Sequence, residues 1–240
     1  MTTLQAVENA QVNRDLAALG RDLDAFFQDQ VVRFAETVPY ASHLTGASEP
    51  LNETYYIRHR IETIKRIWLT SRLDALALAQ MVEEDYECAR PWARYACEEL
   101  DHDRLFLADL AAHGVDEDRV RKEPLFPATV EMVNMMERGI ETDGSLPVVS
   151  YSLIVEWNSL RYSRLAVDRA ARRFSERHVH GARSHLGIDY DEDHYDMILF
   201  IVHRLITKGK YSESGLFDYL TEVSQYLQRY FKELYSETVQ

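Results

Sequence analysis

Residues 98–103 read EELDHD, so four acidic side chains and one histidine fall within six positions. Glu99 and His102 are three residues apart, a spacing that places both side chains on one face of an α-helix. Glu98 is expected to point about 100° further round that helix, and the two aspartates beside His102 to face water or a neighbouring helix. Carboxylate and imidazole at this spacing also occur in the di-iron sites of helical bundles. The motif therefore has two interpretations, a solvated acidic face or half of a metal site.

A further acidic residue lies within an apolar stretch. Glu156 is surrounded by the sequence YSLIVEWNSL, residues 151–160. Burying a carboxylate is costly unless a cation or a metal ion compensates its charge. Taken alone, Glu156 is better interpreted as a core residue paired with Arg161 or Arg164.

The third segment is SHLGIDYDEDH, residues 184–194. His185 and Asp189 are four residues apart and share a helical face. His194 follows His185 by nine residues, so a regular helix would point it almost the opposite way. A kink or bulge near Gly187 would bring His194 back to the shared face, because such irregularities concentrate at functional sites. If the helix stays regular, Glu192 faces the site instead.

Together the three segments give six candidate metal ligands on three helices. They are Glu99, His102, Glu156, His185, Asp189 and His194, with Glu192 as the alternative to His194. Imidazole and carboxylate suit iron, and the set contains no thiolate. Three carboxylates would also compensate much of the charge of two ions. The sequence therefore predicts a site for two Fe(II) ions.

The composition narrows the possible partners. The chain has 240 residues, with 27 Lys and Arg against 40 Asp and Glu, which gives a net charge of −13. An acidic surface repels phosphate backbones and anionic lipid, so we expect a small-molecule substrate and neither nucleic acid nor a membrane as partner. No apolar run is long enough to cross a bilayer and no export signal is visible, so we expect a cytoplasmic protein. The oligomeric state stays open, with a homodimer among the states considered.

Apolar residues recur at helical spacing along most of the chain, and no alternating strand pattern is apparent. Pro91 is expected near the start of the helix that carries EELDHD, and Gly114 at its end. We therefore predict one all-α domain over residues 1–240, a bundle of about seven helices with loose termini at 1–12 and 236–240. The predicted helices are 13–35, 57–82, 92–113, 127–139, 147–174, 176–207 and 214–234.

From the second helix to the seventh, these motifs resemble the haem-oxygenase-like di-iron oxidases and oxygenases in both order and residue type. In that family one core helix carries Glu and His, as Glu99 and His102 do, and another carries a lone Glu, as Glu156 does. A third carries His-x-x-x-Asp-x-x-His. His185 and Asp189 fit that pattern, but the final histidine arrives two residues late as His194, and Glu192 occupies its place. A local insertion is easier to accept than loss of the ligand, so His194 is preferred.

The resemblance implies an enzyme with two Fe(II) ions as cofactor and O2 as co-substrate, acting through a peroxo-di-iron intermediate. It suggests N-oxygenation of a small amine or amino-acid-derived substrate. The alternative is oxidative C–C or C–N cleavage of an amino acid or fatty acid to an alkene, nitrile or one-carbon product. Such enzymes serve specialised-metabolite pathways. The amine is preferred because aromatic and arginine residues surround the motifs.

Four residues are candidates for the substrate pocket: Tyr151, Trp157, Tyr95 and Arg161. Large aromatic residues at helical spacing more often belong to the core. The same fold also contains metal-free thiaminase-like hydrolases and a cofactor-free oxidase, for which Cys97 would be the nearest nucleophile. A ferritin-like bundle would need a second Glu-x-x-His motif, and a helical interaction protein would place every acid on the surface. These remain the competing hypotheses.

Overall fold

The structure is a computed structural model that describes residues 3–46 and 49–239, with side chains described for 16–46, 49–187 and 193–239. Within these residues the chain is helical and contains no strand, which confirms the all-α prediction. The α-helices are α1 (Thr3–Thr37), α2 (Glu53–Glu84), α3 (Tyr86–Glu99), α4 (His102–Ala112), α5 (Glu117–Lys122), α6 (Pro127–Asp143), α7 (Leu146–Asn158), α8 (Arg164–Arg173), α9 (His180–Glu192), α10 (His194–Thr207) and α11 (Glu213–Thr238). A π-helical turn (Ser159–Ser163) follows α7, and a 3₁₀ turn (Glu176–His178) precedes α9.

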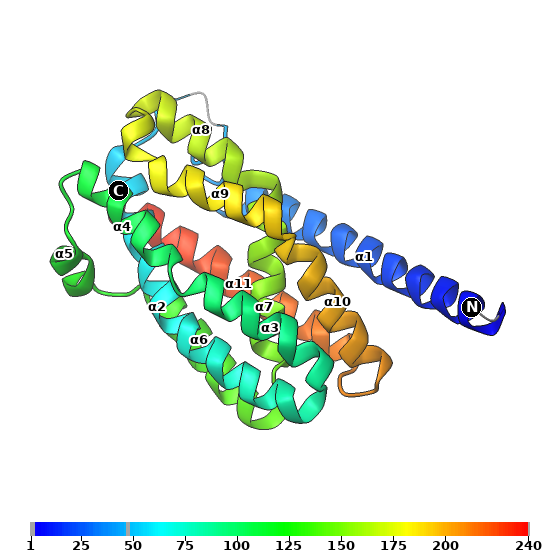
Figure 1. The fold of residues 1–240 in the computed structure, drawn as a ribbon. Helices are drawn as coiled ribbons and strands as arrows, with labels where there is room; N and C mark the ends of the chain where they lie inside the picture. Colours follow the sequence, from blue (N-terminus) through cyan, green and yellow to red (C-terminus); the bar gives the residue numbers. More distant parts are fainter. Residues whose placement is uncertain (1–2, 47–48, 240) are drawn as a thin grey trace.

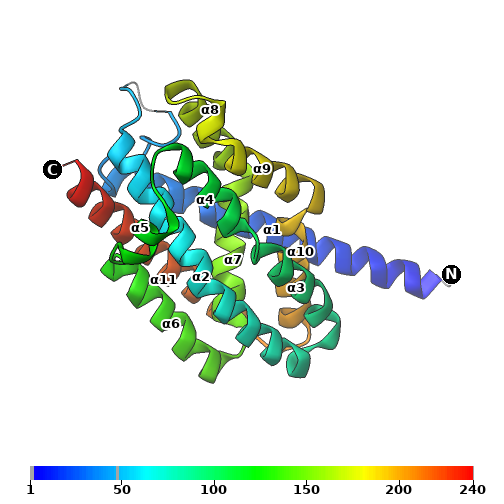
Figure 2. The same ribbon diagram turned by 60° about the vertical axis from the view of Figure 1, so that its left-hand side comes forward.

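Helix α7 runs through the middle of the bundle (Figures 1 and 2). It packs against α2, α6, α10 and α11. Its sequence, LPVVSYSLIVEWN, is apolar on nearly every side, as expected of a helix that is surrounded by others. Glu156 is therefore held inside the bundle by a helix whose other residues are mostly apolar.

The surrounding helices bury one apolar stripe each. On α2, Leu73, Ala77 and Met81 are fully buried, at the spacing of a single helical face. On α11, Leu216 and Leu220 form the equivalent stripe. These faces close round α7 and form one of three hydrophobic clusters among the described residues, and a polar group inside it needs compensating partners.

Two of the predicted helices are each divided in the structure. The predicted helix 92–113 consists of α3 and α4, separated by Leu100 and Asp101. The predicted helix 176–207 consists of the 3₁₀ turn, α9 and α10, with Asp193 between the two α-helices. Pro91 also lies inside α3 and not near its start, because α3 already begins at Tyr86.

Helix α1 extends beyond the rest of the bundle at its N-terminal end, and the two chain ends lie far apart (Figures 1 and 2). The terminal helices reach further than predicted, since α1 begins at Thr3 and α11 continues to Thr238. In the part of the chain that the structure describes, no helix has the length and apolar character needed to cross a membrane.

Candidate metal centre

Glu99 and His102 meet across the turn between α3 and α4. Glu99 is the last residue of α3 and His102 the first residue of α4, so they do not share one regular helix as predicted. The backbone forms a tight turn here, in which the Asp101 N–H donates a hydrogen bond to the Glu98 carbonyl oxygen at 3.4 Å. His102 is buried, and its Nδ1 lies 3.0 Å from Glu99 Oε2. The interruption keeps the carboxylate and the imidazole together.

Glu98 does not point away from this site, contrary to the expectation from helical geometry. Its Oε2 lies 3.0 Å from Nε2 of His194. The reason is that His194 begins a new helix, α10, which starts beside the end of α3. The other acids of the motif behave as expected. Asp101 is exposed, and Asp103 faces the neighbouring helix α2, where it accepts a hydrogen bond from Trp68 Nε1 at 2.6 Å.

Glu156 is buried with only 5% of its surface exposed. Its Oε1 accepts a hydrogen bond from the Tyr95 hydroxyl at 3.0 Å, and its Oε2 lies 3.9 Å from His194 Nδ1. Arg161, one of the two arginines suggested as its partner, forms an ion pair with Asp24 of α1. The π-helical turn begins three residues after Glu156, and π-turns concentrate at functional sites.

The helix of the third motif breaks at Asp193, which adopts the left-handed conformation with φ 53° and ψ 45°. Aspartate tolerates this region better than most residues. Gly187, the expected position of an irregularity, instead lies within the regular part of α9. The break restarts the helix at His194 and turns that side chain inward, where it is 1% exposed. The predicted interruption therefore exists, six residues later than Gly187.

His185 joins the same interior from α9. The centroid of its ring lies 4.0 Å from that of His102, and Phe106 stacks on it at 5.2 Å. The side chains of Asp189 and Glu192 lie outside the described residues. Their assignment as ligands therefore stays a prediction.

The described candidates form two groups that share one carboxylate. One group is Glu99, His102 and His185, and the other is Glu99, Glu156 and His194; within each, one possible ligand atom per residue lies within 4.8 Å of the others. Glu99 Oε1 is buried and has no hydrogen-bond partner among the described residues. A buried carboxylate oxygen without a partner is costly, and a cation between the two groups would compensate it. The donor set of nitrogen and oxygen atoms fits iron.

Further acidic and phenolic groups surround these residues. Burial, and then the negative charge of Glu99, raises the pKa of the Asp74 carboxyl to about 8. Burial, and then the charges of Glu156 and Glu99, raises the pKa of the Tyr95 hydroxyl well above its usual value. Asp74 was not singled out from the sequence, where it is one acid among many on α2. The only signal was its position in an apolar helical stripe next to Leu73.

The four predicted pocket residues divide into two pairs. Tyr95 and Tyr151 lie beside the candidate ligands, and Glu99 and Glu156 both influence the pKa of each hydroxyl. Trp157 and Arg161 face α1 instead: Trp157 Nε1 donates to Asp24 Oδ1 at 2.9 Å, and the Arg161 guanidinium lies 4.3 Å from the Trp157 ring centroid. Sequence spacing could not separate the pairs, because it does not show which helix lies opposite.

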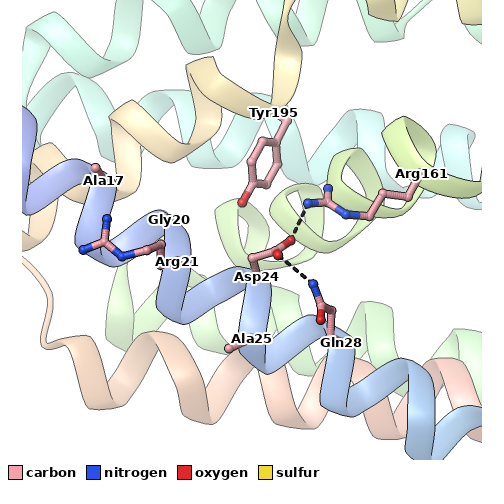
Figure 3. Close-up of a pocket in the computed structure, with 8 residues that line it drawn as sticks. All are labelled: Ala17, Gly20, Arg21, Asp24, Ala25, Gln28, Arg161 and Tyr195. Carbon is pink, nitrogen blue, oxygen red and sulfur yellow. Dashed lines mark hydrogen bonds and ion pairs between the residues drawn. The ribbon is translucent and has the colours of Figure 1, made fainter.

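Arg161 and Asp24 border a surface pocket of about 560 Å³ between α1, the π-helical turn and α10. Figure 3 shows Asp24 directed toward Arg161 and Gln28, with Tyr195 of α10 on the opposite wall. Tyr195 follows His194 directly in the chain. The pocket therefore lies beside the start of α10, the helix that carries the candidate ligand His194.

Comparison with known proteins identifies the fold of this chain. No protein-family model matches the chain, and a search of curated proteins gives no match. Three solved structures are similar over most of their length. The first, from Shewanella denitrificans, is described as a domain of unknown function with a heme oxygenase-like fold; it shares 15% identity over 90% of this chain and 92% of its own, with a TM-score of 0.73.

The second is a TenA homolog from Pseudomonas syringae, with 17% identity over 92% of each chain and a TM-score of 0.67. The third is a CADD-like protein of unknown function from Nostoc punctiforme, with 14% identity over 96% of this chain and all of its own, and a TM-score of 0.60. Identities at this level establish the fold alone. The chain therefore has the haem-oxygenase-like fold, as the resemblance of its motifs predicted.

Proposed function

We propose that the protein is an O2-dependent non-haem di-iron oxidase or oxygenase that acts on a small amine or amino-acid-derived substrate. The observation that carries this proposal is the shared carboxylate: Glu99 belongs to both groups of candidate ligands. A carboxylate with one oxygen toward each group is suited to bridge two ions. Two ferrous ions held there would supply the electrons and the open coordination positions that O2 reduction requires.

The residues of the chain have distinct roles in this arrangement. His102 and His185 would complete one iron site with Glu99, while Glu156 and His194 would complete the other. Asp189 is retained as a further proposed ligand. The carboxylates of Glu99, Glu156 and Asp189 would compensate three of the four positive charges of two Fe(II) ions, which lowers the cost of holding them inside a packed core.

Glu98 and Tyr95 would position ligands. A carboxylate oxygen only accepts hydrogen bonds, so Nε2–H of His194 is the donor to Glu98. On a neutral ring this leaves the lone pair on Nδ1, which faces Glu99 and Glu156 at 3.9 Å each. Carboxylates that fix a histidine ligand in this way raise metal affinity. The Tyr95 hydroxyl holds one oxygen of Glu156 and leaves the other directed to His194.

Iron stoichiometry of single variants tests the proposal. The wild-type protein, loaded with Fe(II) under anaerobic conditions, should bind two ions per chain. Glu99→Ala should lose both, whereas His185→Ala and Glu156→Ala should each lose one. Asp101→Asn is the matched control, because Asp101 belongs to the same acidic motif but is exposed. Two tightly bound ions in Glu99→Ala would refute the shared-carboxylate site.

Exposure of the loaded protein to O2 then tests the reaction class. Oxidation of Fe(II) that is faster with one member of a panel of amines and amino acids would identify the substrate. The products formed from that substrate distinguish N-oxygenation from C–C or C–N cleavage. The competing metal-free hypothesis has support from the TenA homolog among the similar structures. It predicts no iron uptake and activity that is insensitive to replacement of Glu99.

A further inference from the structure

The surface pocket between α1, the π-helical turn and α10 has walls of its own, because none of the candidate metal ligands is among the described residues that line it. Its volume of about 560 Å³ lies within the range of small-molecule binding sites. The space exists because α1 presents small residues at three lining positions, Ala17, Gly20 and Ala25. Larger residues there would occupy the gap between α1 and α10.

Asp24 fixes the orientation of Arg161 at one side of this pocket. Its Oδ1 accepts hydrogen bonds from Trp157 Nε1 at 2.9 Å and from the Arg161 guanidinium, and its Oδ2 accepts one from Gln28 Nε2 at 2.7 Å. The Arg161 guanidinium carbon also lies 4.3 Å from the centroid of the Trp157 ring. One edge and one face of the guanidinium are therefore held in place by the protein itself.

The guanidinium that Asp24 holds still has unused hydrogen-bonding capacity. Arg161 Nη1 is buried and has no hydrogen-bond partner among the described residues, whereas the Arg161 side chain as a whole is 33% exposed. A buried donor without an acceptor costs free energy. An acceptor atom on a ligand that reaches Nη1 from the pocket would offset this cost.

A second arginine and a tyrosine line the same pocket. Arg21 of α1 is exposed, and its guanidinium has no ion pair or hydrogen bond with the residues whose side chains are described. The described lining therefore has two cations, Arg21 and Arg161, against the one anion Asp24, in a chain whose net charge is −13. Burial raises the pKa of the Tyr195 hydroxyl to about 12, so this group stays protonated and can donate a hydrogen bond. Figure 3 shows Tyr195 extending from α10 toward α1, with Arg21 and Arg161 on either side of it.

We propose that this pocket binds a small organic acid, whose carboxylate is held between Arg21 and Arg161. Arginine suits the role because the planar guanidinium matches the two oxygens of a carboxylate. The single excess positive charge of the lining fits a carboxylate monoanion better than a phosphate group, which carries about −1.5 to −2 at pH 7. Ala17, Gly20 and Ala25 leave an uncharged surface for the apolar part of the acid. The inference does not depend on the proposed function, since the pocket needs no metal ion.

The bound acid would also connect α1 with the segment that follows Glu156. Asp24 already links α1 to this segment through Trp157 at the end of α7 and Arg161 in the π-helical turn. An acid held by both Arg21 and Arg161 adds another link across the same gap. Because a ligand that binds only the folded state stabilises that state, the acid should raise the unfolding temperature of the protein.

Calorimetric titration of the purified protein, without added iron, tests the inference. The probes are benzoate, phenylacetate and hexanoate, each paired with its primary amide, together with inorganic phosphate. At least one acid should bind at one site per chain, and its amide and phosphate should each bind at least about tenfold more weakly. Arg21→Gln should weaken binding of that acid by about threefold or more, because the pair is exposed to solvent. Arg161→Gln, which removes the oriented cation, and Ala25→Leu, which fills the pocket, should each weaken it by about tenfold or more.

Two variants control for charge and for place. Arg33→Gln removes the same charge from α1 as Arg21→Gln does, but Arg33 is exposed, pairs with Asp29 and does not line the pocket. It should bind the acid as the wild type does. Glu99→Ala should also bind the acid with unchanged affinity. Loss of binding in Glu99→Ala would place the acid at the candidate metal centre and overturn the inference.

Unfolding temperatures separate lost binding from lost folding. Arg161→Gln gives up the ion pair with Asp24 and should be less stable, so Arg21→Gln is the decisive variant and should unfold at the wild-type temperature. Saturating acid should raise the unfolding temperature of the wild type and leave that of Ala25→Leu unchanged. The inference is overturned if none of the three acids binds, if amide or phosphate binds as tightly as the acid, or if Arg21→Gln keeps wild-type affinity.

Discussion

Gly181 is the residue on which the position of His185 depends, and replacing it with alanine should remove one of the two iron ions. Gly181 is the second residue of α9 and lies against the backbone of α4. A Cβ atom placed there would be 1.9 Å from the Leu105 carbonyl oxygen and 2.5 Å from its carbon. Backbone atoms cannot rotate aside as a side chain can. The close approach therefore requires glycine.

The displacement of α9 in the Gly181→Ala variant can be calculated from these distances. An ordinary Cβ contact begins at 3.4 Å, so α9 must move from α4 by about 3.4 − 1.9 = 1.5 Å. This movement would also stretch the hydrogen bonds that the N–H groups of Gly181 and Ala182 donate to the Asp109 carboxylate, at 2.7 and 2.8 Å. His185 follows one turn later and moves with the helix. Metal ligands need positioning to within about 0.5 Å, so the group formed by Glu99, His102 and His185 should fail.

Gly187→Ala on the same helix is the matched control. A Cβ atom at Gly187 meets nothing within 4 Å, and alanine favours an exposed helical position over glycine by about 1 kcal/mol. We expect Gly181→Ala to lose about 1–3 kcal/mol of stability, typical of an overpacked contact, and to keep one iron ion. Gly187→Ala should keep both ions and unfold at the same or a higher temperature. Two ions and wild-type stability in Gly181→Ala would refute the reasoning.

Three further predictions concern single acids. Glu98→Ala should weaken iron binding by about tenfold to a hundredfold in competition with a chelator, because His194 loses the acceptor of its Nε2–H; unchanged affinity would make Glu98 a mere surface acid. The pKa of Asp74 is raised from 3.8 to about 8, so between these pH values the folded metal-free protein keeps a proton that the unfolded chain releases, and its stability should fall as pH rises. Asp74→Asn should remove this loss. The variant should therefore be more stable than the wild type at pH 9 in denaturant titrations. Asp85 is buried, which would raise its pKa, but its ion pairs with Lys208 and Arg204 prevail and lower the pKa to about 2. This shift corresponds to a stabilisation of about 2 kcal/mol. The stabilisation is present at pH 7 and is lost on acidification from about pH 4 toward 2. Asp85→Asn should lose a similar amount at pH 7, and an unchanged denaturation midpoint would contradict this.

Helical periodicity was sufficient to predict the all-α class, because apolar stripes such as Leu73, Ala77 and Met81 recur whatever the helices pack against. The residue types and spacings of the three motifs selected the segments that carry Glu99, His102, Glu156 and His185, which the structure brings together. Periodicity could not find Asp74. An aspartate is a common residue in an amphipathic helix, and this one becomes unusual only because burial and the negative charge of Glu99 raise its pKa.

The interruptions of the helices explain the side-chain positions that helical periodicity failed to predict. Extrapolating a regular helix turned Glu98 away from the site and placed His194 opposite His185, yet the structure brings Glu98 and His194 to 3.0 Å. A turn at Leu100–Asp101 and a left-handed residue at Asp193 are sufficient to produce this change. Each breaks only a few backbone hydrogen bonds, a local cost that tertiary packing or a bound ion can offset. Because two such breaks and the π-helical turn all lie within three residues of a candidate ligand, we infer that the ligand cluster, and not local helix propensity, determines where these helices end.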